Sequence, residues 1–140
     1  MIITFKVFKE KIESGEKTTT IREYNEGQFN KFANTYLNKK KLQLYWHNPR
    51  NGGKLIKEAD MAGLPDKLQF CKQDSPVGKN LQIHRNLQFI KNVATNEKLP
   101  LFELAKTEGF KNDSEMWDWF WLEYYTQMYE KKFMLIRWLP

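Results

Sequence analysis

The sequence is built from short runs in which apolar and polar residues alternate, and one such run lies near each end of the chain. Residues 2–8 carry the first run and residues 132–138 carry the last. A period of two residues is typical of a β-strand with one buried face. The strict alternation of strand and helix that a doubly wound parallel fold requires is missing. These observations favour a small, mostly antiparallel β-barrel that carries helices.

Turn-forming residues separate the runs. The segment from Asn48 to Gly53 is dense in turn formers, so it should reverse the chain between two strands. Residues 60–80 have only a weak pattern, interrupted by two loop signals. Besides the two terminal strands, the strands predicted in this way lie at 18–23, 42–47, 54–59, 81–84 and 87–90.

Helices are predicted where apolar residues recur at spacings of three and four. A short helix after the first strand should end at Gly15, because glycine is favoured just beyond a helix. A second helical pattern covers residues 29–37 and should end near Asn38. Pro100 can start a third helix, which Gly109 would close.

A fourth helix should follow three candidate N-cap residues at 112–114. Its expected core face consists of Trp117, Phe120, Trp121, Tyr124 and Met128. Strands at both ends with helices between them give the predicted fold class, which is α+β. The expected architecture is a small mixed or antiparallel β-barrel with flanking helices.

The composition fits one compact domain. The chain has 140 residues, of which 41% are hydrophobic and 15% aromatic. This is enough to bury a core, and the aromatic share is unlike that of disordered chains. We therefore expect a single domain over residues 1–140. No apolar run approaches the ~20 residues that span a bilayer, and residues 1–6 lack the pattern of a signal peptide.

The counts of cysteine and histidine restrict the possible cofactors and the compartment. The single cysteine, Cys71, cannot form an internal disulfide and is typical of the reducing cytoplasm. One cysteine and two histidines, without a cluster of carboxylates, predict no metal site and no other cofactor.

The chain carries a positive charge that favours an anionic partner. Twenty-three Lys and Arg residues against 17 Asp and Glu give a net charge of +6. RNA is a common partner of a small basic domain. The residues expected to contact phosphates or to stack on bases are Arg22, Lys39, Lys40, Lys41, Arg50 and Tyr45. Lysines that keep an exposed strand edge soluble are an equally good interpretation of the 39–41 run.

The densest polar cluster is the segment from Gly15 to Arg22, which reads Gly-Glu-Lys-Thr-Thr-Thr-Ile-Arg. The period-two geometry of a strand places Thr18, Thr20 and Arg22 on one face. Lys17 can reach Thr20 only if it belongs to a turn after Gly15. A lysine, a threonine hydroxyl and an arginine brought together would bind an anion or a polarised carbonyl.

This segment resembles the N-terminal motif of the ASCH domain family, Gly-x-Lys-x-x-Thr-x-Arg, which follows a first strand and a short helix. The similarity continues at Glu108, which precedes Gly109 and Phe110 and is followed by an amphipathic helix and a final strand. It covers residues 2–24, the strand at 41–47 and residues 97–138. The resemblance implies a PUA-like β-barrel.

The resemblance also implies an activity. Small bacterial members with a similar motif are amidohydrolases that remove the acetyl group from N(4)-acetylcytidine. Their working lysine, threonine and glutamate fall on Lys17, Thr20 and Glu108 of this sequence. Other members are proposed RNA binders, and ribonuclease activity has also been attributed to the family.

The roles of the motif residues stay open at this point. A threonine hydroxyl needs a neighbouring base, and Lys17 can be that base only if burial or nearby cations populate its neutral amine. Arg22 could supply this influence and bind the substrate carbonyl. Glu108 could shuttle a proton, orient the amine, or pair with Lys17 and keep it charged. Thr20 could equally be a strand threonine without a chemical role.

Two functions from different classes therefore follow from the sequence. The first is an amidohydrolase that acts on an acylated cytidine or a related modified nucleoside. The second is a PUA-like module that binds RNA without catalysis. A ribonuclease is a weaker third candidate, because neither histidine belongs to a recognisable acid–base pair.

Overall fold

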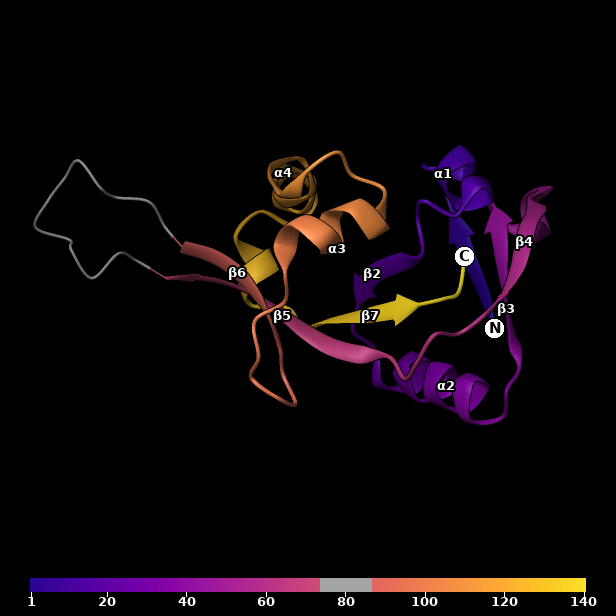
Figure 1. The fold of residues 1–140 in the computed structure, drawn as a ribbon, viewed down its shortest axis with the longest axis horizontal. Coiled ribbons are helices and arrows are strands. Elements are labelled where there is room, and N and C mark those ends of the chain that lie inside the picture. Colours follow the sequence, from indigo (N-terminus) through magenta and orange to yellow (C-terminus); the bar gives the residue numbers. More distant parts are fainter. Residues whose placement is uncertain (74–86) are drawn as a thin grey trace, which may run out of the picture.

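The computed structural model of the chain describes residues 1–73 and 87–140 (Figure 1). In these residues seven β-strands form two sheets, accompanied by four α-helices and two short 3-10 helices. The predicted α+β class is confirmed. The strand predicted at 81–84 lies outside the described residues.

The first sheet joins the N-terminal strand to a hairpin. β1 (Ile2–Phe5) is parallel to β3 (Lys41–Trp46), and β4 (Lys54–Asp60) is antiparallel to β3. A 3-10 turn over Pro49–Asn51 connects β3 to β4, as the turn formers in this segment predict. A parallel pair requires a long connection, which the chain between β1 and β3 supplies.

The second sheet has the strand order β2-β7-β5-β6 and all its pairs are antiparallel. β2 (Thr19–Glu23), β7 (Phe133–Arg137) and β6 (Leu87–Asn92) lie where strands are predicted. β5 (Asp66–Gln73) is not predicted by the sequence pattern. It presents only Leu68 and Phe70 as fully buried apolar residues, so its alternation is too short to stand out.

The two sheets do not close into one barrel within the described residues, so the α+β class is confirmed but the expected β-barrel is not. β1 pairs only with β3, and β2 pairs only with β7. The Arg22 guanidinium lies between these two unpaired edges and donates a hydrogen bond to the Thr4 carbonyl at 2.7 Å. A side chain thus takes the place of backbone pairing at this corner.

The sheets are joined at another corner by the residues that follow β7. The Trp138 N–H donates to the Thr18 carbonyl, and the Leu139 N–H donates to the Asp60 carbonyl, both at 2.9 Å. The C-terminal residues therefore connect the start of β2 to the end of β4.

Two short helices end at glycines in the left-handed backbone region. α1 (Lys9–Ser14) ends at Gly15, with φ of 84°, and α3 (Leu101–Glu108) ends at Gly109, with φ of 100°. Both ends were predicted and are confirmed. At Gly109 a Cβ atom would also lie 3.0 Å from Cγ of Phe8, so glycine is needed there for space as well as for backbone conformation.

The two longer helices begin at asparagine caps. α2 (Glu26–Leu37) starts after Asn25, whose side chain accepts a hydrogen bond from the Gln28 N–H. α4 (Asp113–Tyr124) starts after Asn112, one of the predicted caps, and continues into a 3-10 helix over Tyr125–Tyr129. In Figure 1, α3 and α4 lie on one side of the second sheet and α2 lies on the other.

The buried apolar residues form two clusters that share β7. Phe133 and Leu135 belong to the cluster under α3 and α4, whereas Met134 and Ile136 belong to the cluster that includes the first sheet. β7 is therefore buried on both faces. The predicted core face of the fourth helix is confirmed at Trp117 and Phe120 on α4 and at Met128, which lies in the 3-10 helix that follows. It is wrong at Trp121, which is 39% exposed.

Phe70 tests the importance of the unpredicted strand β5. Its ring packs against Trp117, Phe120 and Phe133 and is fully buried. Phe70→Ala should lower the free energy of unfolding by about 3–5 kcal/mol, because it removes burial and leaves a cavity. Urea denaturation measures this effect. As a control, Leu122→Ala should change it by about 0.5 kcal/mol or less, because Leu122 is 70% exposed.

Candidate functional site

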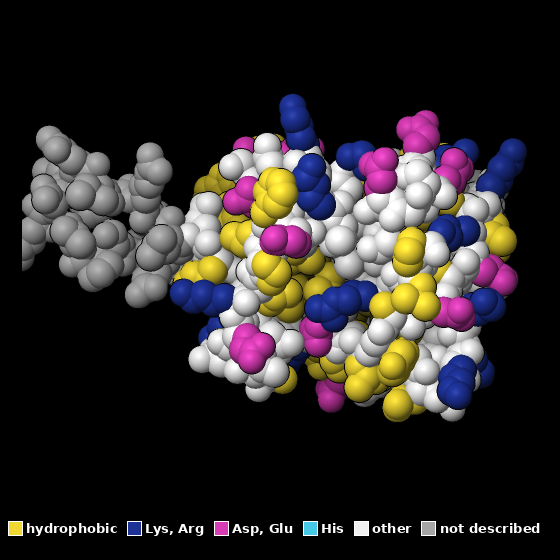
Figure 2. Space-filling view, in the orientation of Figure 1, with side chains coloured by type: hydrophobic (Ala, Val, Ile, Leu, Met, Phe, Trp, Pro, Cys, Tyr) yellow, Lys and Arg dark blue, Asp and Glu magenta, His cyan; other side chains and the backbone are white. Residues whose placement is uncertain are grey.

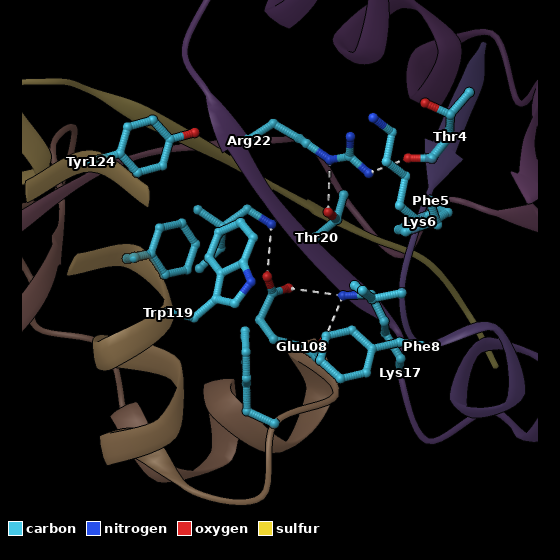
Figure 3. A pocket seen from close by; sticks show the side chains of 14 residues that line it. Thr4, Phe5, Lys6, Phe8, Lys17, Thr20, Arg22, Glu108, Trp119 and Tyr124 are labelled. Carbon is cyan, nitrogen blue, oxygen red and sulfur yellow. Dashed lines mark hydrogen bonds and ion pairs between the residues drawn. The ribbon is translucent and has the colours of Figure 1, made fainter. Parts of the chain in front are cut away.

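A cavity of about 310 Å³ opens between the unpaired edges of β1 and β2 and is covered by the C-terminal end of α3 and by α4. Figure 3 shows the side chains that line it. Four of them are polar residues singled out by the sequence motifs: Lys17, Thr20, Arg22 and Glu108. Most of the remaining lining is aromatic: Phe5, Phe8, Phe110, Trp119, Phe120 and Tyr124.

Lys17 lies in the turn between α1 and β2. This position was predicted as the condition for Lys17 and Thr20 to reach the same site. Its side chain is almost fully buried, and Nζ donates hydrogen bonds to the backbone carbonyls of Thr19, at 2.7 Å, and Glu108, at 2.6 Å. The amine also lies 5.5 Å from the centre of the Phe8 ring. Two carbonyls and an aromatic wall therefore hold this amine at the edge of the cavity.

Glu108 is the last residue of α3 and is 3% exposed. Its Oε1 accepts a hydrogen bond from the Ile21 backbone N–H at 2.9 Å, and its Oε2 accepts a short one from the Thr19 hydroxyl. Lys17 Nζ lies 3.9 Å from Oε2. These partners offset the unfavourable placement of a carboxylate at the negative end of a helix dipole.

Thr20 and Arg22 lie on the same face of β2, as the strand period predicts. Arg22 Nε donates to the Thr20 hydroxyl oxygen at 3.0 Å, and Nη2 donates to the Thr4 carbonyl. The guanidinium also lies over the Phe5 ring, 5.0 Å from its centre. Arg22 therefore fixes the position of the Thr20 hydroxyl and keeps a cationic group beside it.

Burial controls the titration of this cluster. It lowers the pKa of Lys17; the nearby Glu108 carboxylate opposes this shift, and the positive charge of Arg22 adds to it. Burial also lowers the pKa of Arg22, but a guanidinium stays charged at neutral pH. Burial raises the pKa of Tyr124, with Glu23 and Glu123 adding to this shift, so its phenol stays neutral. The cavity thus combines a lysine biased towards its neutral amine with a permanent cation.

The other predicted binding residues do not line this cavity. Thr18 lines a second cavity, of about 270 Å³, together with Thr107 and Arg137. Tyr45 lies on β3 in register with Thr4, and Arg50 lies in the 3-10 turn after β3.

The predicted lysine run follows α2 and ends in Lys41, the first residue of β3, and it does not line the cavity. Lys39 and Lys40 are exposed, and the Lys41 amine lies 3.3 Å from the Asp60 carboxylate. On the face shown in Figure 2, Lys and Arg side chains are dispersed among acidic ones and form no continuous stripe. Of the residues expected to contact RNA, Arg22 lines the cavity with the other motif residues, whereas Arg50, Tyr45 and the lysine run do not.

Thr19 and the aromatic lining of the cavity were not predicted as parts of the site. Thr19 belongs to the opposite face of the strand from Thr20, yet its hydroxyl binds Glu108 and lies 3.1 Å from the Thr107 hydroxyl. Trp119 lies outside the helical stripe that was assigned to the core. The exposed side of an amphipathic helix gives no local indication that it will border a cavity.

Two further findings concern metals and membranes. In residues 1–73 and 87–140, no three His, Cys, Asp or Glu side chains are grouped so that they could hold a metal ion. None of the helices described in these ranges has the length and hydrophobicity that crossing a bilayer requires.

Comparison of the chain with protein-family models, with curated proteins and with solved structures found no match.

Thr19 should stabilise the fold through the Glu108 carboxylate. Thr19→Val keeps the shape of the side chain but removes the hydroxyl that donates to Oε2. We expect a loss of about 1–3 kcal/mol in the free energy of unfolding, because a buried carboxylate loses a hydrogen-bond donor. Urea denaturation measures this loss, and Thr19→Ser should recover most of it. Equal losses in the two variants would show that packing, not the hydroxyl, matters at this position.

Proposed function

We propose that this protein is a PUA-like hydrolase of the ASCH type, which removes the acyl group from the exocyclic amine of an acylated cytosine nucleoside. The observation that carries the proposal is that Lys17, Thr20 and Glu108 line one cavity although Glu108 is far from the others in sequence. In a PUA-like fold of this kind, the barrel stays open at the β1–β2 corner, and the site occupies that opening.

The size of the cavity supports a small substrate. Its volume of about 310 Å³ is at the lower end of the range of about 300–1,000 Å³ for small-molecule sites. A single nucleoside suits a compact cavity, whereas a nucleic-acid strand requires a long open groove. The aromatic lining matches the planar face of a base, and Lys17, Thr20 and Arg22 match polar groups at its edge.

The first half of the proposed reaction transfers the acyl group to Thr20. The Thr20 oxygen attacks the amide carbonyl carbon, and its proton passes to the neutral amine of Lys17. The charge that develops on the carbonyl oxygen faces Arg22, which is already bound to the Thr20 oxygen. When the tetrahedral intermediate collapses, the C–N bond breaks and the leaving amine takes the proton from Lys17. The products of this half are a Thr20 ester and free cytidine.

The second half hydrolyses the ester. Water attacks the ester carbonyl carbon and gives a proton to Lys17. Collapse breaks the bond to the Thr20 oxygen, which recovers its proton from Lys17 and restores the hydroxyl. The carboxylic acid leaves and loses its own proton to solvent at neutral pH. One water is consumed for each amide bond that is broken.

Lys17 and Thr20 share no hydrogen bond among the described residues, so their contact in the reaction requires the substrate or a water molecule between them. The Lys17 nitrogen makes two hydrogen bonds to carbonyls. A neutral amine has two N–H groups and one lone pair, so both bonds can persist while the lone pair accepts a proton.

We assign Glu108 the role of orienting the amine. Both of its carboxylate oxygens already accept hydrogen bonds, and its backbone carbonyl holds Lys17. A carboxylate committed in this way is better suited to position a lysine than to shuttle protons. Its Oε2 lies 3.9 Å from the amine and favours the charged form of Lys17, but burial outweighs this effect and lowers the pKa of the lysine.

The alternative functions have less support in the geometry. An RNA-binding module would use the basic residues expected from sequence, of which Arg22 lines the cavity but Arg50 and the lysine run do not. A ribonuclease would use a histidine pair, but His47 does not line the cavity and His84 lies outside the described residues.

Hydrolysis of N(4)-acetylcytidine by the purified protein tests the proposal. Release of cytidine, followed by chromatography, should fall by about 10³-fold or more in Thr20→Ala, which loses the nucleophile. Lys17→Met should lower kcat by about 10²–10⁴-fold, which is typical for loss of a general base.

Thr126→Ala is the matched control, because Thr126 is an exposed threonine outside the cavity, and it should hydrolyse the substrate at the normal rate. Turnover that survives both Thr20→Ala and Lys17→Met would exclude the mechanism. Steep loss of RNA affinity with added salt, together with no turnover, would favour the non-catalytic module.

The pH dependence of the reaction should report the titration of Lys17. Since the neutral amine is the working form and burial lowers its pKa, kcat/KM should rise with pH along a limb below the usual range for lysine. Arg22→Gln removes a positive charge that lowers this pKa, so the pKa should increase and the limb should move to higher pH. Arg22→Lys keeps the charge and should leave the limb near its original position.

The profile is measured on the residual activity of each variant. A limb that stays in place in Arg22→Gln would contradict the assignment of Lys17 as the base, whatever the overall loss of rate.

A further inference from the structure

Trp119 differs from the other aromatic residues around the cavity. It lies on α4 and lines the cavity, yet it is 42% exposed. The indole packs against Phe120, at a centroid distance of 4.9 Å, and against Phe110, at 6.2 Å. In Figure 3 the ring extends from α4 towards the polar groups of the cavity. The indole is thus held in place by packing and is still accessible to solvent.

The neighbouring aromatic rings are already engaged with protein groups. Arg22 lies over Phe5, and Lys17 lies near both Phe5 and Phe8. Phe120 is 2% exposed and packs against Phe70. In the described part of the chain, no cation–π contact involves Trp119. The indole is therefore the best placed ring to contact a ligand.

Arg22 still has hydrogen-bond donors for a ligand. Its Nε donates a hydrogen bond to Thr20 and its Nη2 donates one to Thr4, but its Nη1 makes none among the described residues. A guanidinium donates in its own plane and suits a carbonyl or a ring nitrogen. The cavity thus offers an aromatic surface for a flat ring and donors for the edge of that ring.

We propose that Trp119 is a specificity-determining residue that stacks on the pyrimidine base while Arg22 binds the carbonyl edge of the base. The inference rests on the proposed function, because it concerns the same cavity, but it requires only binding. It restricts the substrates to acyl amines on a planar heterocycle and excludes aliphatic acyl amines of similar length.

Binding of cytidine, the expected product, tests this inference without any turnover. Loss of an aromatic platform should weaken binding by about 5- to 150-fold, the equivalent of a base-stacking contact. We expect this increase in Kd for Trp119→Ala by titration calorimetry, whereas Trp119→Phe should stay within a few-fold of the original protein.

Trp121→Ala is the matched control. Trp121 lies on the same helix with similar exposure, 39%, but it does not line the cavity. Its removal should leave the Kd for cytidine unchanged. Far-ultraviolet circular dichroism and thermal unfolding of each variant verify that α4 is intact. If Trp119→Ala unfolds, the Kd for cytidine is measured on Trp119→Phe instead. Stacking predicts that Trp119→Phe still binds cytidine.

The outcomes separate this inference from the proposed function. Cytidine binding that depends on Trp119, without hydrolysis of N(4)-acetylcytidine, supports the inference and contradicts the enzyme. Hydrolysis that depends on Thr20, with the same KM in Trp119→Ala, supports the enzyme and overturns the inference. Equal weakening by Trp119→Ala and Trp121→Ala, or no cytidine binding by the original protein, also overturns it.

Discussion

The hydrogen bonds between the buried Glu108 carboxylate and β2 are the interaction on which the packing of α3 against β2 depends. A carboxylate removed from water requires hydrogen-bond donors, and β2 supplies them through the Ile21 backbone N–H and the Thr19 hydroxyl. The Ile21 N–H is available because β2 is an edge strand on this side. By occupying that edge, the end of α3 takes the place of a neighbouring strand. The opening between β1 and β2 that results is the cavity.

Much of the fold was predictable because its determinants are local. Glycine after α1 and α3, asparagine before α4 and the turn formers before β4 each mark the boundary of an element. β5 was not predictable in this way, since its pairing with β6 and β7 organises it more than its own short pattern does. Whether the two sheets close into a barrel could likewise not be predicted from local patterns, because closure requires strand edges that are far apart in the sequence to pair.

The candidate site was predictable to the extent that a motif carried it. The period of the strand places Thr20 and Arg22 on one face, and a turn after Gly15 was the condition for Lys17 to reach them. The match of Glu108 came from resemblance. Thr19 and Trp119 required the packing of α3 and α4 against the sheet, which sequence spacing does not encode. The lysine run illustrates the converse, since charge alone does not indicate where a side chain will lie.

The strand β7 couples the stability of the two hydrophobic clusters. Alternate residues of this one strand complete different cores, so neither core can lose its packing without withdrawing support from the other. A two-sheet protein with separate interiors could melt in stages. Here the shared strand makes a single cooperative transition the natural outcome, and it ties the rigidity of the cavity walls to the stability of the whole domain.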